Sequence, residues 1–244
     1  MRINWNNIKM IVLLGIVGFL FAFSSRKNAE REVSKPNVKF VGENNLYITN
    51  EAVSKLLIQN YGGTKNIAKE ALVLSKLENA LNANPMIKTA EVYMTVNGTL
   101  KAEIEQKTPI ARVQVKKPYY IDSQGFYMPL SNNYSARVPL VTGDVKKEDL
   151  SSIFIVANKI KHDDFLKKNV IEIHQNTNNK IQLKLRQCNF VVELGSVDFL
   201  DRKISNLKAF YQKNKKDQTL NNYSKVNLQF KNQVVCTKNV SNGA

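Results

Sequence analysis

The sequence predicts an α+β protein with a single N-terminal transmembrane helix, a small domain in the order strand, helix, helix, strand, strand, and a mixed β domain with a C-terminal edge strand. Every residue from Met10 to Phe23 is apolar or glycine. Apolar residues then recur at helical spacing through two segments before Pro85, and mostly at alternate positions after it. Helices and strands segregated along the chain in this way are typical of α+β folds.

The apolar segment predicts a transmembrane helix at residues 10–25, after a short cytoplasmic tail at 1–9. A helix from Ile8 to Ser25 would span about 27 Å, close to the hydrocarbon thickness of a bilayer. Ala22-Phe23-Ser24 is a small-x-small site, so secretion after cleavage is the alternative; the continuation into Arg26-Lys27 favours an uncleaved anchor. The Lys and Arg residues that flank the segment mildly favour an orientation with the soluble domains in the cytoplasm. Large domains often translocate regardless of flanking charge, so we expect the soluble domains to be extracytoplasmic.

The formal net charge of +16, from 36 Lys and Arg against 20 acidic residues, raises nucleic-acid binding as a hypothesis. The basic residues are scattered, and no helix-turn-helix or RNA-binding motif occurs, so we expect no nucleic-acid partner. The densest run, residues 213–216, predicts a solvated helix end, with contact to an anionic lipid or polymer as the alternative. Cys188 and Cys236 are interpreted as buried thiols, with a disulfide left open.

The first soluble domain is predicted to follow a charged linker at residues 26–36. A strand at 38–41 precedes a helix that Thr49 caps and Gly62-Gly63 ends. A second helix ends at Asn84-Pro85. Strands at 87–96 and 100–105 then form a hairpin through Asn97-Gly98. The apolar positions expected on the two helices are Val53, Leu56, Leu57, Tyr61, Leu72, Leu74, Leu77, Ala80 and Leu81.

The second domain is predicted to be mainly β structure. Asp122 and Gly125 supply a turn within residues 120–128. A helix near 148–161 precedes strands at 170–174, 180–186 and 190–194. A helix containing Lys203 follows, and the last strand is expected at 225–235, with a disordered polar tail at 239–244.

The order of motifs resembles the FtsQ/DivIB family, and the first domain resembles a POTRA domain, a module that pairs with other chains through its sheet edges. Residues 84–92 and 100–111 resemble the family's Pro, apolar, Ala-x-Val, hairpin and Glu-x-x-x-Pro-apolar-Ala pattern. The Asp-x-x-Gly at 122–125, the Pro-x-apolar-x-Gly at 139–143 and the Leu-Gly at 194–195 follow in the family's order. The chain departs from the family at 95–98 and at 227–230, where Asn-Leu-Gln-Phe replaces Asp-Leu-Arg-Tyr. The resemblance places the POTRA-like domain at 37–112 and the β domain at 113–238.

The resemblance implies a plasma-membrane divisome scaffold at the division septum. Its last strand would accept a strand from an FtsB/DivIC-like partner, which travels with an FtsL-like protein, and so would link them to the septal peptidoglycan synthase. The candidate contacts by position are Phe230, Asn232, Gln233 and Val234. Alternation also makes Phe230 a candidate core residue, which is the favoured interpretation. Val234→Pro is expected to abolish partner binding and leave the fold intact.

No catalytic, cofactor-binding or metal-binding constellation is predicted. The two histidines, His162 and His174, are interpreted as surface or half-buried polar residues. Asp163-Asp164 is interpreted as a helix-end doublet, and Glu103 with Glu105 as one polar strand face. Two alternatives remain open: a POTRA-bearing component of outer-membrane protein export, and a peptidoglycan-binding envelope protein.

Overall fold

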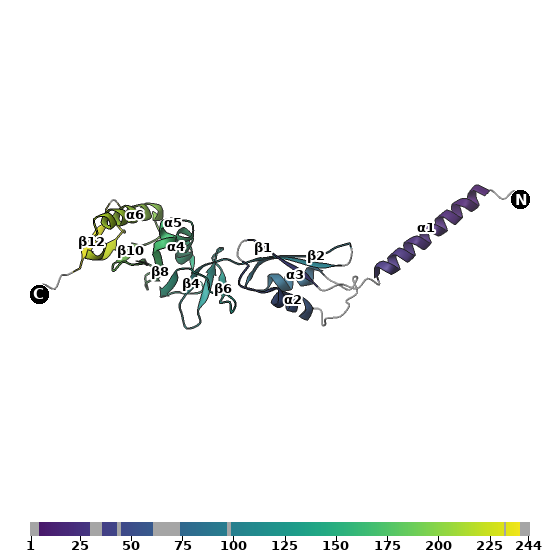
Figure 1. Cartoon of the computed structure of the whole chain (residues 1–244), viewed down its shortest axis with the longest axis horizontal. Coiled ribbons are helices and arrows are strands. Elements are labelled where there is room, and N and C mark those ends of the chain that lie inside the picture. The colour runs from purple at the N-terminus through teal and green to yellow at the C-terminus, as the bar shows by residue number, and fades with distance from the viewer. Residues whose placement is uncertain are drawn as a thin grey trace. The chain divides into compact units, whose positions relative to one another are not determined.

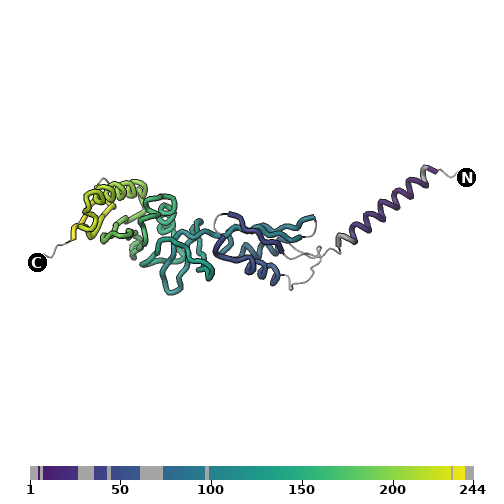
Figure 2. The backbone as a smooth tube through the Cα atoms, in the orientation of Figure 1, coloured from purple at the N-terminus to yellow at the C-terminus, as the bar shows by residue number. Residues whose placement is uncertain are grey.

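The computed structural model describes residues 5–29, 36–42, 45–60, 74–96, 99–231 and 233–239 (Figures 1 and 2). The chain forms two compact units that divide between Gln106 and Lys107. The sequence predicts this domain boundary after residue 112. The two boundaries differ because β4 (Pro109–Val113) pairs with strands of the second unit. The linker beyond Ala29, the Asn97-Gly98 turn and the tail from residue 240 lie outside the described residues.

The N-terminal helix α1 (Trp5–Ala29) agrees with the predicted anchor and extends beyond it at both ends (Figure 1). Its segment Ile8–Arg26 has a mean hydropathy of 2.2 and is long and apolar enough to cross a membrane. The apolar side chains of this segment are exposed, as those of a lipid-facing helix would be.

The first unit has the predicted order of elements. It contains β1 (Asn37–Val41), α2 (Asn50–Gln59), α3 (Leu74–Asn82), β2 (Ile87–Met94) and β3 (Leu100–Gln106). The sheet order is β1-β3-β2, with β3 parallel to β1 and antiparallel to β2. One face of the sheet packs against α2 and α3; the most deeply buried side chains of this core are Val53, Leu77, Leu81, Ile87, Ala102 and Ile104.

Local signals in the sequence explain where the described helices begin and end. The Thr49 hydroxyl accepts the N–H of Ala52 at 3.2 Å, which confirms the predicted cap of α2. After α3, the Asn84 side chain accepts the N–H of Met86 at 2.9 Å and turns the chain at Pro85. Gly62-Gly63, Tyr61 and Leu72 lie outside the described residues.

Gln106, the last residue of β3, holds the loop before α2. Its side chain is 3% exposed and accepts the N–H groups of Tyr47 at 2.8 Å and Ile48 at 3.2 Å. Its amide also donates to the Ile48 carbonyl at 3.0 Å. Because unpaired buried amide groups are costly, this one side chain joins the end of the sheet to the start of the helical layer.

The second unit is a mixed sheet covered by helices. In addition to β4, the described strands are β5 (Tyr119–Asp122), β6 (Tyr127–Pro129), β7 (Leu140–Gly143), β8 (Val170–Gln175), β9 (Ile181–Leu185), β10 (Val191–Gly195), β11 (Tyr223–Asn227) and β12 (Val235–Lys238). Their order in the sheet is β12-β11-β10-β9-β8-β7-β4-β5-β6. Figure 1 shows α4 (Ser151–Lys161), α5 (Asp164–Asn169) and α6 (Leu200–Lys216) along one side of it. The helices and strands share one core.

The predicted turn at Asp122 and Gly125 joins β5 to β6. The Asp122 carboxylate is 1% exposed, accepts the N–H groups of Gln124 and Phe126, both at 2.9 Å, and pairs with Lys107 at 2.8 Å. Gly125 has φ +87°, a conformation that glycine adopts at little cost. The Asp-x-x-Gly motif therefore stabilises the backbone of this turn.

Asp163 connects α5 to α6. Its Oδ1 accepts the N–H groups of Phe165 and Leu166 at 3.1 Å each, and its Oδ2 pairs with Lys208 of α6. Burial raises the pKa of this carboxyl, but the hydrogen bonds from Lys208 and from the two backbone groups outweigh burial and hold the pKa below its usual range.

We expect acid to remove part of the stability of the second unit through Asp163. The ionised carboxylate is favoured in the folded state, so its contribution is complete above the unfolded pKa of about 3.9 and is lost as pH falls through the lowered folded pKa. Urea unfolding of Asp163→Asn, which keeps a capping side chain, should depend less on pH below about 4 than that of the wild type. Asp164→Asn, at an exposed neighbour, should keep the wild-type dependence. Identical pH profiles for Asp163→Asn and the wild type would contradict this assignment.

Candidate partner-binding edge

The predicted last strand at 225–235 is a hairpin in the structure, which corrects the sequence prediction. β11 ends at Asn227 and pairs in parallel with β10. The chain then turns, and β12 returns antiparallel to β11 at the end of the sheet. The C-terminal edge strand is therefore Val235–Lys238, and the first half of the predicted strand is an interior strand.

The turn has a local cause in the residues that depart from the family pattern. The side-chain oxygen of Asn227 accepts the N–H of Gln229 at 2.9 Å, which bends the backbone out of the strand. Leu228 stays buried and donates its N–H to the Glu193 carbonyl at 2.9 Å, whereas Phe230 is 48% exposed. The favoured interpretation of Phe230 as a core residue is wrong because strand alternation ends at Asn227.

The predicted contact residues lie in the connection between the two strands. Phe230 and Gln233 are exposed, and Val234 is half-buried immediately before β12. Asn232 lies outside the described residues. The structure thus brings three of the four residues to the segment that enters the edge strand.

Hydrogen-bond directions along β11 follow from its pairing with β10. The Leu228 N–H bonds to Glu193 of β10, and the directions alternate from one residue to the next. The backbone groups of Val226 therefore also face β10. Those of Lys225 and Asn227 face the opposite way, toward β12.

The same alternation identifies the open groups of β12. Thr237 and Val235 lie opposite Lys225 and Asn227 in the register, so their backbone groups pair with β11. The N–H and C=O groups of Cys236 and Lys238 therefore point away from the sheet. No described residue hydrogen bonds to these outward groups. They form a short free edge.

A groove of about 580 Å³ lies beside this edge, between α6 and the hairpin. Phe210 and Tyr223 lie edge to face with ring centroids 5.3 Å apart, and Phe190 packs on Phe210 at 5.7 Å. Buried Asn214 donates to the Phe210 carbonyl at 2.9 Å and accepts from Thr219 at 2.8 Å. The residues that line the groove are Asn206, Ala209, Phe210, Lys213, Asn214, Asp217, Thr219, Tyr223, Val234 and Cys236.

The α6 side of this groove was missed at the sequence level. The run at 213–216 was correctly predicted as the end of a helix, because α6 ends at Lys216 with basic residues in its last turn. Nothing in the periodicity of α6 indicated that Lys213 and Asp217 lie across a groove from the last strand. That proximity depends on the return of β12 along β11.

The opposite edge of the sheet is unsuited to strand addition. β6 is only three residues long and ends in Pro129, which lacks an N–H. Short edge strands and proline are common devices that prevent pairing with other chains. In the second unit, β12 is therefore the more suitable of the two edges.

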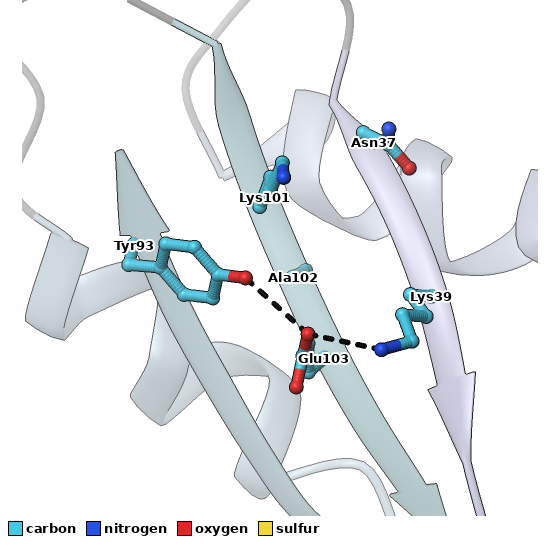
Figure 3. Close-up of a pocket in the computed structure, with 6 residues that line it drawn as sticks. All are labelled: Asn37, Lys39, Tyr93, Lys101, Ala102 and Glu103. Carbon is cyan, nitrogen blue, oxygen red and sulfur yellow. Dashed lines mark hydrogen bonds and ion pairs between the residues drawn. The ribbon is translucent and has the colours of Figure 1, made fainter. Parts of the chain in front are cut away.

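The residues that the sequence offers as possible catalytic or metal-binding groups mostly take part in hydrogen bonds and ion pairs at the surface. The Thr142 hydroxyl lies 2.9 Å from His174 Nδ1 and donates to Glu172 at 2.8 Å, on adjacent strands β7 and β8. Lys39 pairs with Glu103 (Figure 3) and Lys88 with Glu105. Both cysteines are free thiols, and burial raises the pKa of each. Within the described ranges, no cluster of His, Cys, Asp or Glu could hold a metal ion.

Comparison with known families agrees with this architecture. The family model described as "FtsQ/DivIB, C-terminal related" matches residues 108–237. The chain belongs to the FtsQ/DivIB family. A POTRA-like domain model matches residues 39–105, which agrees with the predicted resemblance. The chain is also similar to the cell division protein FtsQ of Geotalea daltonii, with 23% identity over 68% of this chain.

The match covers 64% of that relative's length. Membership of the family places this chain among proteins that include a cell division protein. Together with α1, it fits a single-pass membrane protein in cell division.

Proposed function

We propose that this chain is a membrane-anchored divisome scaffold that recruits and links septal cell-wall synthesis proteins by β-strand addition at β12. The observation that supports the proposal most directly is the free edge of β12 beside a groove. An extended segment of a partner would pair with the outward groups of Cys236 and Lys238. Its alternate side chains would enter the groove.

The groove favours an amphipathic strand. Phe210, Tyr223 and Val234 offer apolar surface, while Lys213 and Asp217 supply charges of both signs. Aromatic side chains often provide most of the binding energy at such sites. The proposed partner is an FtsB/DivIC-like bitopic protein that is associated with an FtsL-like protein and, through it, with the septal peptidoglycan synthase.

The exposed turn before β12 would extend the contact. Phe230, with 48% of its surface exposed, would act as an aromatic anchor, and exposed Gln233 as a polar contact. Val234 lines the groove and would contact the partner there. Asn232, from the same segment, completes the proposed contact set.

The proposed topology follows from the same role. A cytoplasmic N-terminus, α1 in the plasma membrane and both soluble units outside the cytoplasm would place β12 among the extracytoplasmic parts of division proteins. The chain would act without catalysis, cofactors or nucleic acid.

A fluorescent fusion in dividing cells tests this function. We expect a band at midcell, and filamentous cells when the chain is depleted. A chain truncated after Val234, which lacks β12, should fail to restore division, while truncation after Asn239 should restore it. A uniform envelope signal, or normal division after depletion, would contradict the divisome role. Full function of the chain without β12 would contradict strand addition at this edge.

A further inference from the structure

Lys203 of α6 is a lysine that the fold buries without an ion pair. The residue is 7% exposed, and its Nζ donates to the Ser196 carbonyl at 2.6 Å. It forms no ion pair with any described residue. Burial lowers the pKa of this lysine, and the Asp198 carboxylate opposes that shift. The fold therefore keeps a charge in a place from which water is largely excluded.

A buried charge of this kind calls for a reason other than stability. Removal of an ammonium group from water is costly, and one hydrogen bond to a carbonyl offsets only part of that cost. An apolar side chain of similar length would fill the same space without the cost, and such replacements are often neutral or stabilising. The place where the hydrogen bond is made, rather than its strength, indicates what Lys203 contributes.

The hydrogen bond from Lys203 holds the corner at which β10 leads into α6 (Figure 1). Ser196 is exposed and directly follows Gly195, the last residue of β10. Three residues after Ser196, Phe199 has φ +53°, a left-handed conformation that is unfavourable for a bulky residue. A corner that contains a strained residue relaxes unless other contacts hold it, and the Lys203 ammonium supplies such a contact.

The other side of the same corner lies against the turn that leads into β12. Gly195 has φ +71°, and a Cβ built there would lie 2.6 Å from Cγ of Gln229. Gln229 is the second residue after β11, and its N–H bonds to the Asn227 side chain. The preceding N–H, of Leu228, bonds to Glu193 of β10. The corner and the turn are therefore packed together with no room for a side chain at Gly195.

The helix that carries Lys203 also forms one wall of the groove beside β12. Asn206, three residues after Lys203, lines the groove from α6, and Val234 and Cys236 line it from the hairpin. The corner is connected to both walls, because α6 begins from it and Gln229 lies against it. A shift of the corner would therefore change the separation between the two walls of the groove.

We propose that Lys203 is a positioning residue for the partner edge: its ammonium fixes the corner between β10 and α6, and the corner fixes the turn at Gln229 and the distance between α6 and β12. This inference rests on the proposed function, because it assigns Lys203 to the same groove. Without the ammonium, the Ser196 carbonyl would bond to water, since Ser196 is exposed. β12 would still pair with β11, but the groove would vary in width and would bind a partner strand less tightly.

Lys203→Met tests the proposal, with Lys208→Met as the matched control. Lys208 lies five residues later on α6 and pairs with Asp163 of α5 rather than with the corner. Hydrogen exchange of the free full chain in detergent micelles, read by mass spectrometry, should rise at least about threefold at residues 229–238 in Lys203→Met. Lys208→Met should keep the wild-type exchange there.

Urea unfolding separates positioning from packing. The urea midpoint of the second unit should not fall in Lys203→Met, because the variant removes a buried charge. A lower midpoint, with exchange raised equally in β8, β9 and β10, would make Lys203 a general packing residue and would overturn the proposal.

A second variant tests the route through the corner. Gln229→Ala shortens the exposed side chain that lies against Gly195, so it should raise exchange at residues 229–238 by itself. The addition of Lys203→Met should then raise exchange no further, because both substitutions act on one contact. Additive effects of the two substitutions, or wild-type exchange in either single variant, would overturn the positioning role.

Partner affinity links the corner to the groove. Isothermal titration with the purified FtsB/DivIC-like partner should give a Kd at least about fivefold higher for Lys203→Met than for the wild type. A wild-type Kd in this variant would overturn the proposal. Failure of the wild-type chain to bind this partner would contradict the proposed function, and exchange at residues 229–238 would still decide whether Lys203 positions β12.

Discussion

Replacing Gly143 with alanine is expected to destabilise the second unit by about 4 kcal/mol or more, a large part of the stability of a typical domain. Gly143 ends β7 with φ +94°, and a Cβ built there would lie 2.0 Å from the carbonyl oxygen of Gln175 on β8. That oxygen belongs to the backbone of a paired strand and also accepts the Asp144 N–H at 2.8 Å. It cannot move away without disruption of the β7–β8 pair.

Gly125→Ala is the matched control for this prediction. Gly125 has a similar φ of +87°, but the nearest neighbours of an added Cβ are ring atoms of Phe154 at 3.2 Å, which belong to a side chain. Its cost should be about 1–3 kcal/mol, from backbone strain alone. Urea unfolding by circular dichroism compares the two variants. If Gly143→Ala were no more damaging than Gly125→Ala, the close strand approach would not be the reason for glycine.

Lys238→Pro is expected to weaken binding of the proposed FtsB/DivIC-like partner by about 2–3 kcal/mol, which corresponds to roughly 30- to 150-fold in Kd. The N–H of Lys238 points away from β11, so its loss spares the sheet but removes a donor from the edge. The proline ring would also obstruct an incoming strand. Isothermal titration of the full chain with the purified partner measures the effect.

Two controls separate edge pairing from other effects of substitution. Lys238→Ala retains the N–H and should bind within about twofold of the wild type, because the side chain is exposed. Thr237→Pro removes an N–H that faces β11, so it should detach β12 and lower the melting temperature. Wild-type affinity of Lys238→Pro for the partner would exclude pairing at this position.

The Val234→Pro substitution suggested by the sequence is a weaker test than Lys238→Pro. Val234 precedes β12 and lines the groove, so proline there would alter the turn and the groove lining together. The sequence prediction assumed one continuous strand from 225 to 235. In the structure the edge strand is β12, so Lys238 is the sharper position at which to test the proposed pairing.

Local sequence signals determined much of the fold correctly. Thr49 caps α2, Asp122 and Gly125 make the β5–β6 turn, and the Pro-x-apolar-x-Gly step places Gly143 where two strands approach closely. Each of these outcomes depends on short-range hydrogen bonds, backbone conformation or the period of apolar residues. The motif order was likewise sufficient to recognise the family, which the family models then confirmed.

Tertiary structure alone decided which strands are edges. Alternation shows which face of a strand is buried, but it is the same for an interior strand and for an edge strand. The interior position of β11 and the groove between α6 and β12 both depend on pairing between segments far apart in the sequence. The sequence by itself therefore determined the elements and their turns, whereas long-range pairing decided which backbone groups remain free to bind a partner.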